Sequence, residues 1–373
     1  MSFIPVNLPD LSGNEAAYLM NCVRSGWISS EGPYVKQLED GLAARLGRKY
    51  GVAVSNGTTA LDLAVAALGI GPGDEVILPT FTIISCAAAI VRAGATPVVV
   101  DCDPLTWNMD CTQVEKLISP RTRAIMVVHI YGLPVDMDPI LALAQKYHLR
   151  VIEDAAEVIG QTYRGRPCGS FGDISTLSFY PNKHITTGEG GMVLTDSEEL
   201  AERCRDLRNL CFGRKRRFVH EQLGWNFRMS NLQAAVGVAQ LERLDQTIAR
   251  KRQIGYLYDE LLSDLPCQRP LRSPNYAENI YWVYGLVPHD SVRGNAEIWI
   301  QELAKRGIGC RPFFYPMHQQ PVFRKRGWFQ HVRCPVAERL AERGFYIPCG
   351  LGLTNSQQHE VAQAVRAVLA SYS

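Results

Sequence analysis

Two side chains have the types and the placement that bonding to an aldehyde cofactor requires. Lys183 lies in the small-residue loop 178–191, directly after an apolar segment, and Asp154 follows an earlier apolar segment. A lysine amine attacks an aldehyde when burial or a neighbouring cation lowers its pKa and leaves it partly unprotonated. A buried carboxylate needs a partner, which a protonated ring nitrogen would supply. The pair therefore indicates pyridoxal phosphate (PLP), held as a Schiff base on Lys183.

Both residues also have ordinary structural interpretations. A lysine in a polar loop is usually solvated, and Asp154 would be a favoured cap for a helix beginning at Ala155. The run 188–191, Gly-Glu-Gly-Gly, favours a tight loop with close backbone approach. His184 fits a loop residue better than a second catalyst. Because the acid and the lysine occur together, we favour the cofactor interpretation.

The segment 55–59, Ser-Asn-Gly-Thr-Thr, has the composition of an anion site. It follows a predicted strand and opens a predicted helix, so backbone N–H groups, the helix dipole and hydroxyl groups converge there. Ser178 could add a hydroxyl to the same phosphate. Taken alone, the segment is equally well explained as an ordinary helix cap with a glycine turn. It is not a Walker A loop, because the lysine is missing, and no Gly-x-Gly-x-x-Gly follows a strand.

The elements that must position these residues alternate along the first two thirds of the chain. The expected strands are 50–54, 75–78, 96–100, 124–129, 150–153 and 174–179. The expected helices between them are 58–68, 83–93, 111–118 and 138–147. This alternation predicts an α/β fold with a mostly parallel sheet flanked by helices. Ligands of such sheets bind at the carboxyl ends of the strands, where Asp154 lies.

Further helices are indicated by caps and periodicity. Ser12 and Glu15 form a capping-box pattern at the start of a helix, and Asp196 precedes a predicted helix over 197–210. Apolar residues at helical spacing predict one long helix over 230–262.

The chain is long enough for one large and one small domain. We expect a large PLP-binding domain, including the N-terminal segment, over 1–245. The linking helix and a smaller C-terminal α+β domain are expected over 246–373. The elements expected in the small domain are strands 281–287 and 309–313 and helices 295–306 and 356–370.

The composition of the 373 residues is that of an ordinary globular protein, with 46% hydrophobic and 20% charged residues. A formal net charge of +2 argues against a nucleic acid as the main partner. The apolar runs are too short to cross a bilayer, and no secretory signal is visible, so we expect no membrane partner. The 11 cysteines are scattered and never spaced Cys-x-x-Cys, which indicates reduced thiols in the cytoplasm and no metal site.

Three further segments combine groups that could bind a ligand. Residues 224–231 mix aromatic and polar side chains before the long helix, and they could equally be a helix entry. Residues 214–217, Arg-Lys-Arg-Arg, could meet a diphosphate or form a solvated loop. Residues 311–318 contain two prolines and end in His318, which is more often a structural than a catalytic residue.

With these residues in place, the chain resembles the DegT/StrS-like nucleotide-sugar aminotransferases, which are fold-type I PLP enzymes. The resemblance runs nearly end to end, from 25–30 to the final helix. The motifs that carry it are 54–58, 73–76, 79–82, 153–157, 171–175 and the Lys183 loop, with further matches at 27–30 and 311–318.

The resemblance implies roles at matching positions. Lys183 would bind the cofactor covalently and then move a proton, and Asp154 would pair with the ring nitrogen. The remaining cofactor contacts are implied for Gly57, Thr58 and Ser178 on the phosphate, Glu157 near the ring, and Asn226 from the neighbouring subunit. The active sites would then be shared across a homodimer.

The resemblance also implies substrate contacts at Trp27, Ser29, Ile83 and His318, and Arg217 of the basic run 214–217 is a further candidate for substrate binding. Ile83 departs from many relatives, which place an aromatic residue there to stack on the PLP ring. With Ile83, an aliphatic side chain would cover this face of the PLP ring. The expectation of a Schiff base on Lys183 does not depend on this contact.

The activity that the resemblance implies is transfer of an amino group from glutamate to a nucleotide-linked keto sugar, with GDP-4-keto-6-deoxymannose as the expected acceptor. Alternatives are another UDP- or dTDP-linked 3- or 4-keto sugar, and a PLP-dependent sugar dehydratase. The dehydratase variant of the family replaces the lysine by histidine, whereas here Lys183 is in register. An amino-acid aminotransferase using Arg311, and a PLP-binding regulator without turnover, are further alternatives.

Overall fold

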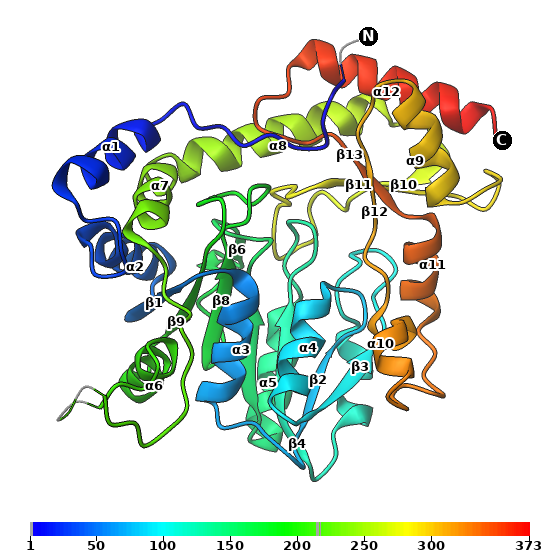
Figure 1. Cartoon of the computed structure of the whole chain (residues 1–373). Helices are drawn as coiled ribbons and strands as arrows, with labels where there is room; N and C mark the ends of the chain where they lie inside the picture. Colours follow the sequence, from blue (N-terminus) through cyan, green and yellow to red (C-terminus); the bar gives the residue numbers. More distant parts are fainter. Residues whose placement is uncertain (1–2, 214–215, 217) are drawn as a thin grey trace.

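The computed structural model describes residues 3–213, 216 and 218–373, and its largest element is a central sheet. The sheet has seven strands in the order β1-β9-β8-β5-β4-β2-β3. Their bounds are β1 Tyr50–Val54, β2 Glu75–Pro79, β3 Thr96–Val100, β4 Thr122–Val128, β5 Arg150–Asp154, β8 Ile174–Ser178 and β9 Gly191–Thr195. Figure 1 shows helices on both sides of this sheet.

The sheet is parallel from β8 to β3 and antiparallel at its other edge. Neighbouring strands from β8 through β5, β4 and β2 to β3 pair in parallel, and β9 pairs antiparallel with both β8 and β1. The prediction of a mostly parallel sheet is confirmed, although it lacked β9. Because β9 returns directly from the loop after β8, an antiparallel pairing needs no crossover helix.

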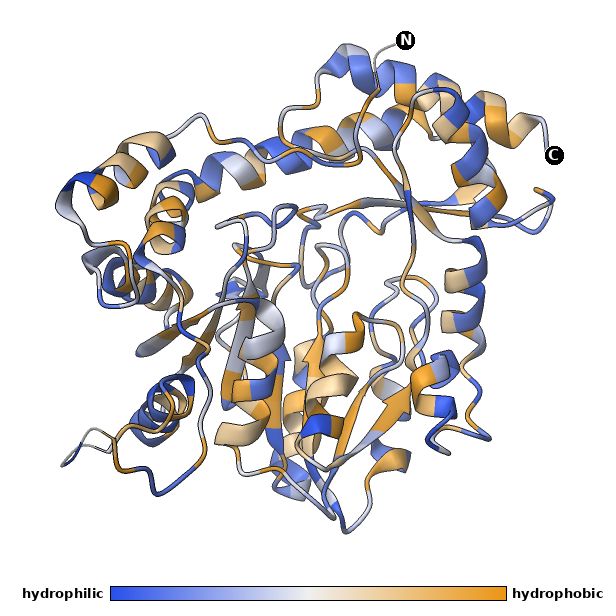
Figure 2. Ribbon diagram, in the orientation of Figure 1, coloured by the Kyte–Doolittle hydropathy of each residue, from blue (hydrophilic) through white to orange (hydrophobic). Residues whose placement is uncertain are grey.

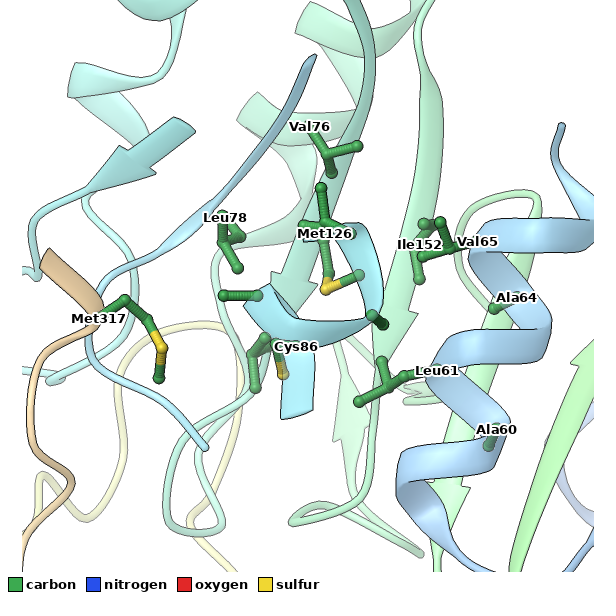
Figure 3. Close-up of a cluster of buried hydrophobic side chains, with 14 of the residues drawn as sticks. Ala60, Leu61, Ala64, Val65, Val76, Leu78, Cys86, Met126, Ile152 and Met317 are labelled. Atoms are coloured by element: carbon green, nitrogen blue, oxygen red, sulfur yellow. The ribbon is translucent and has the colours of Figure 1, made fainter. Parts of the chain in front are cut away.

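The two faces of the sheet are buried under different helices. Val76, Leu78 and Met126 pack with helices α3 (Gly57–Ala67) and α4 (Ile84–Arg92), as the close-up of this cluster shows (Figure 3). Their neighbours Ile77 and Ile125 belong to a second cluster on the opposite face. That cluster is covered by α2 (Pro33–Leu46), α5 (Met137–Tyr147) and α7 (Asn231–Glu242). Successive side chains of a strand point to opposite faces, so two apolar layers require the nearly continuous apolar strands seen in Figure 2.

A second, smaller sheet organises the C-terminal third of the chain. Its order is β10-β11-β13-β12, all antiparallel, with bounds β10 Cys267–Gln268, β11 Tyr284–Pro288, β12 Arg311–Pro312 and β13 Phe345–Ile347. It shares a third apolar cluster with α8 (Leu244–Leu261), α9 (Ala296–Lys305) and α12 (Asn355–Ala370). The N-terminal segment joins this part too, because Ile4 pairs with Ile308.

Several smaller elements complete the described chain. They are α1 Glu15–Ser25, α6 Glu198–Arg208, α10 Pro321–Arg324, α11 Pro335–Arg343, the hairpin β6 Thr162–Tyr163 and β7 Arg166–Pro167, and the 3₁₀ turns η1 Cys111–Gln113, η2 Glu115–Leu117 and η3 Met317–Gln319. Within the described ranges, no helix combines the length and the apolar character that crossing a bilayer requires.

Two helix predictions and two helix-cap predictions were wrong in detail. The expected helix 230–262 is two helices, α7 and α8, which meet at Arg243, whose φ of −111° is not helical. The expected helix 111–118 is two 3₁₀ turns. Ser197, rather than Asp196, caps α6.

The capping box at α1 is absent because its acid has another partner. The helix begins after Asn14, and the carboxylate of Glu15 accepts a hydrogen bond from Gln240 at 2.6 Å. Ser12 therefore lies outside the helix. The division of the chain at 245/246 stays a prediction.

Candidate active site

A cavity of about 700 Å³ lies where the carboxyl ends of β5 and β8 meet the start of α3. Its walls combine the charged residues singled out above with aromatic residues from the C-terminal third. The lining residues are Asn56, Gly57, Thr58, Thr59, Leu61, Ile83, Ser85, Val128, Asp154, Ala156, Glu157, Leu177, Ser178, Tyr180, Asn182, Lys183, Glu189, Trp282, Phe314 and Tyr346. The position is the one at which open α/β sheets bind ligands.

Lys183 reaches into this cavity from the loop between β8 and β9. Its Nζ lies 3.5 Å from Oε1 of Glu157 and 3.6 Å from the centre of the Trp282 ring. Burial lowers the pKa of Lys183, while the negative charges of Glu157 and Asp154 oppose that shift. The amine is therefore closer to its nucleophilic, neutral form than a solvated lysine would be.

Asp154 is the last residue of β5 and lies buried in the floor of the cavity. Its Oδ1 accepts the N–H of Ala156 at 3.1 Å, and its Oδ2 accepts the thiol of Cys86 at 3.4 Å. Burial raises the pKa of Asp154. The alternative that Asp154 caps a helix at Ala155 is wrong, because turns follow the strand there.

Glu157 is the second buried carboxylate of the floor. Its Oε2 accepts the backbone N–H of Tyr131 at 2.9 Å. Burial raises the pKa of Glu157 to about 7, against the lowering effect of Lys183. Such a group can carry or give up a proton near neutral pH, which suits a hydrogen bond to a polar substituent of a ring.

The start of α3 forms an anion cradle beside these carboxylates. Asn56 caps the helix through a capping box with Thr59, and no described residue accepts the N–H groups of Gly57 and Thr58. The hydroxyl of Thr58 lies 2.9 Å from that of Ser85. A Cβ added at Gly57 would lie 2.7 Å from Cβ of Ser178, so only glycine lets the helix start approach this strand end. Free amides, hydroxyls and the helix dipole fit the phosphate of PLP.

A hydrogen-bonded pair beneath the floor holds the end of β5. His129 and Glu153 are fully buried, with 3.0 Å between Nε2 and Oε1. Nδ1 of His129 accepts the N–H of Val135, so Nε2 carries the proton that Glu153 accepts. Both oxygens of Glu153 also accept backbone N–H groups, from Gly169 and Phe171. With Cys168 this group has metal-ligand atoms close together, but hydrogen bonds already occupy the histidine and the carboxylate.

The structure brings most of the predicted cofactor residues into this cavity. Gly57, Thr58, Asp154, Glu157, Ser178 and Lys183 all line it. Asn226 does not; it is exposed and pairs with Asn209 outside the cavity.

The predicted substrate residues are more dispersed. Ile83 lines the cavity and is 45% exposed, whereas Trp27 and Ser29 are exposed on the segment between α1 and α2. His318 is fully buried outside the cavity lining, with Nδ1 2.8 Å from the hydroxyl of Thr80 and Nε2 2.9 Å from Glu338. In this arrangement both ring nitrogens are engaged and unavailable to a ligand. Arg217 lies outside the described residues.

Sequence reasoning missed the aromatic wall of the cavity. Phe314 belongs to this wall, but the segment 311–318 was noted for its prolines and His318 instead. Asn182, a polar lining residue next to Lys183, was also not predicted as a contact. Trp282 lies just before β11 and Tyr346 lies in β13, and neither carried a signal because both are far in sequence from the loop that contains Lys183.

Comparisons with known proteins agree with this geometry. A sequence model of the DegT/DnrJ/EryC1/StrS aminotransferase family matches residues 9–366. The GDP-perosamine synthase of Caulobacter vibrioides is 42% identical over 98% of both chains. The putative pyridoxal phosphate-dependent aminotransferase EpsN of Bacillus subtilis is 36% identical over 96% of this chain and 93% of that one.

A solved structure shows the same fold. The aminotransferase TlmJ from Streptoalloteichus hindustanus superimposes with a TM-score of 0.91, covers 99% of both chains and is 34% identical. The chain therefore belongs to the DegT/DnrJ/EryC1/StrS aminotransferase family, which confirms the predicted fold class, the predicted enzyme class and PLP as the predicted cofactor.

Proposed function

We propose that this enzyme transfers the amino group of glutamate to GDP-4-keto-6-deoxymannose and so makes GDP-perosamine. The observation that carries the reaction type is the meeting of Lys183, Asp154 and Glu157 with an anion cradle in one cavity. The choice of sugar is supported by the 42% identity to the Caulobacter vibrioides GDP-perosamine synthase along nearly the whole chain. The enzyme would act in the cytoplasm, and its product would be a precursor for the synthesis of surface polysaccharide.

The side chains of the cavity divide the work. PLP, when bound, supplies an aldehyde carbon and an electron-accepting ring, through which an amino group passes between two carbon skeletons. Lys183 holds the cofactor and then moves protons at its Nζ, for which its lowered pKa suits it. Asp154 sits buried where a charged ring nitrogen would satisfy it, and Glu157 is placed to hold a proton beside the ring.

The cradle positions the other end of the cofactor. The N–H groups of Gly57 and Thr58 and the hydroxyls of Thr58 and Ser178 would hold the phosphate dianion at the positive end of α3. This anchoring leaves the aldehyde end free to face Lys183.

We propose a homodimer with shared active sites as the working form. Exposed apolar side chains, including Val23 at 63% and Leu223 at 93%, lie on α1 and on the segment that leads to Asn226. Apolar groups exposed in this number mark an interface better than a solvated face. Covering by a second copy would bring its Asn226 toward the phosphate cradle, as the family resemblance implies.

The test adds the two substrates in turn. The purified protein is loaded with PLP and mixed with glutamate, and the cofactor absorption spectrum and 2-oxoglutarate are measured. Conversion of the cofactor to its amine form, followed by its reversal with GDP-4-keto-6-deoxymannose and release of a sugar that contains nitrogen, is expected.

The other outcomes are informative as well. Reversal only with UDP- or dTDP-linked keto sugars would overturn the choice of substrate but retain transamination. A deoxygenated sugar without added nitrogen would identify a dehydratase. A spectrum that glutamate leaves unchanged would contradict transamination from this donor.

A further inference from the structure

The amine of Lys183, the residue proposed to bond the cofactor, lies over the aromatic ring of Trp282, which belongs to the C-terminal third of the chain. Trp282 lies just before β11, lines the cavity and is 6% exposed. The centre of its ring is 3.6 Å from Nζ of Lys183. A cation this close to an indole face is attracted to it, and the attraction is strongest where water is excluded.

Trp282 is held in this position from several directions. Its indole N–H donates to the carbonyl oxygen of Asn182 at 2.8 Å, one residue before Lys183. Its own carbonyl oxygen accepts the ammonium of Lys251 at 2.8 Å. Lys251 is 4% exposed and also donates to the carbonyl oxygen of Cys349 at 2.5 Å.

These contacts tie three parts of the molecule together. Lys251 belongs to α8, Cys349 follows β13, and Asn182 belongs to the catalytic loop. Burying the charged Lys251 is costly unless its hydrogens are bonded, and two carbonyl oxygens and the Cys349 sulfur, at 3.2 Å, satisfy it. Trp282 is therefore held both at the edge of its indole ring and at its backbone carbonyl.

We propose that Trp282 is a positioning residue for Lys183: its ring receives the protonated amine and keeps it in the cavity, opposite Glu157, whenever the nitrogen is not bonded to the cofactor. Glu157 faces the same Nζ at 3.5 Å, so the amine lies between a carboxylate and a ring face. An amine without this support could swing toward the cavity mouth, and each return would delay the proton transfer that the reaction needs.

The direction of the effect on protonation follows from the groups around the amine. Burial has the largest effect and disfavours the protonated form of Lys183, whereas Glu157, Asp154 and Cys86 favour it. His184, next to Lys183 in the chain, is buried, and burial lowers its pKa to about 3, so it adds no charge near neutral pH. The ring of Trp282 also favours the protonated form of Lys183. Phenylalanine or leucine at this position keeps the surroundings apolar, so replacing Trp282 removes the attraction of the indole face while water stays excluded, and the pKa of Lys183 should fall.

The experiment measures that protonation in the protein without cofactor or substrates. Traces of acetic anhydride are added at a series of pH values, and acetylation of Lys183 is followed by peptide mass spectrometry. In Trp282→Leu the pH midpoint of labelling should fall by about 0.5 to 1 pH unit, and in Trp282→Phe by less. Trp107→Phe is the matched control, because Trp107 is buried in the same aromatic cluster and contacts Phe313 rather than Lys183.

An unchanged or higher midpoint in Trp282→Leu, with native circular dichroism, would overturn the proposal. Trp282→Phe preserves the test if the leucine variant does not fold. A second measurement rests on the proposed function: kcat of Trp282→Phe should fall about tenfold while KM for glutamate changes less than about twofold. Because acetylation needs neither glutamate nor a sugar, a wrong substrate assignment would leave its result unaffected.

Discussion

The floor and the roof of the cavity differ in composition and in origin. The floor carries Lys183, Asp154 and Glu157, all placed by the ends of β5 and β8. The roof carries the aromatic rings of Trp282, Phe314 and Tyr346, which come from the C-terminal third. Tyr131 packs behind this roof, with ring centres 5.4 Å from Phe314 and 6.2 Å from Tyr346.

This difference in composition indicates a division of tasks between the floor and the roof. Charges in the floor are costly to bury, and buried groups with shifted pKa values in a cavity are typical of a reaction site. We therefore expect these three residues to act in the proposed reaction. Rings in the roof exclude water and thereby raise the effect of each floor charge. Replacements in the floor should therefore affect the reaction far more than stability, and replacements in the roof should have smaller effects on both binding and rate.

The largest effect is expected at Lys183. Lys183→Ala removes both the attachment point of the cofactor and the group that moves the proton, so kcat/KM should fall by about 10³-fold or more. Steady-state assays with glutamate and the keto sugar measure the loss, and Lys305→Ala, at an exposed lysine that pairs with Glu302 on the surface, is the control. A residual rate within tenfold of the wild type would refute the assignment of Lys183.

Asp154→Asn should have the next largest effect. The amide has the same shape but cannot stabilise a positive ring nitrogen, so kcat should fall about 10²- to 10³-fold. Because burial raises the pKa of Asp154, the buried charge is a cost to folding, and the melting temperature of the apoenzyme should stay level or rise. A variant that melts much earlier, or that retains most of its kcat, would argue for a purely structural aspartate.

Glu157 should make the apoenzyme less stable as the pH rises. Its pKa is raised from 4.5 to about 7 in the folded state, so between these values the folded chain binds more protons than the unfolded chain. The free energy of unfolding from this group therefore falls as pH rises through that window, by about 3 kcal/mol in total. Urea unfolding at pH 5 and pH 8 should show this loss in the wild type and a smaller loss in Glu157→Gln. An equal change in the free energy of unfolding between pH 5 and pH 8 in the wild type and in Glu157→Gln would contradict this prediction.

The floor was predictable from the sequence because its residues are positioned locally. Asp154 and Ser178 end strands, and Gly57 begins a helix, so strand ends and caps place each within a few residues. The parallel sheet then brings separate strand ends to one edge, whatever the rest of the chain does. The alternation of apolar and helical segments was enough to expect Asp154, Gly57 and Ser178 together, whereas Glu157 was expected only from the family resemblance.

The roof was not predictable for the opposite reason. The contact between Trp282 and Lys183 depends on how the second sheet docks over the first, and no local pattern encodes that docking. The same limitation explains the break at Arg243, since the helical periodicity continues through it while the packing partners change from α2 to α12. The burial of His318 could not be predicted either, because its hydrogen bonds to Thr80 and Glu338 join residues that are far apart in the sequence.

The smallest of these effects is expected at Ile83, at the mouth of the cavity. Here the side chain is 45% exposed and aliphatic, where the family resemblance led us to expect an aromatic ring. A tyrosine would have room at this position and would offer a ring face to the cofactor, worth about 0.5 to 1.5 kcal/mol. Ile83→Tyr should therefore lower the Kd of the apoenzyme for PLP by about two- to tenfold, as measured by fluorescence titration. Ile84→Tyr, at the neighbouring position, which is absent from the cavity lining, is the control. If both variants bind PLP equally, the residue at 83 does not cover the ring, and the roof alone shields that face of the cofactor.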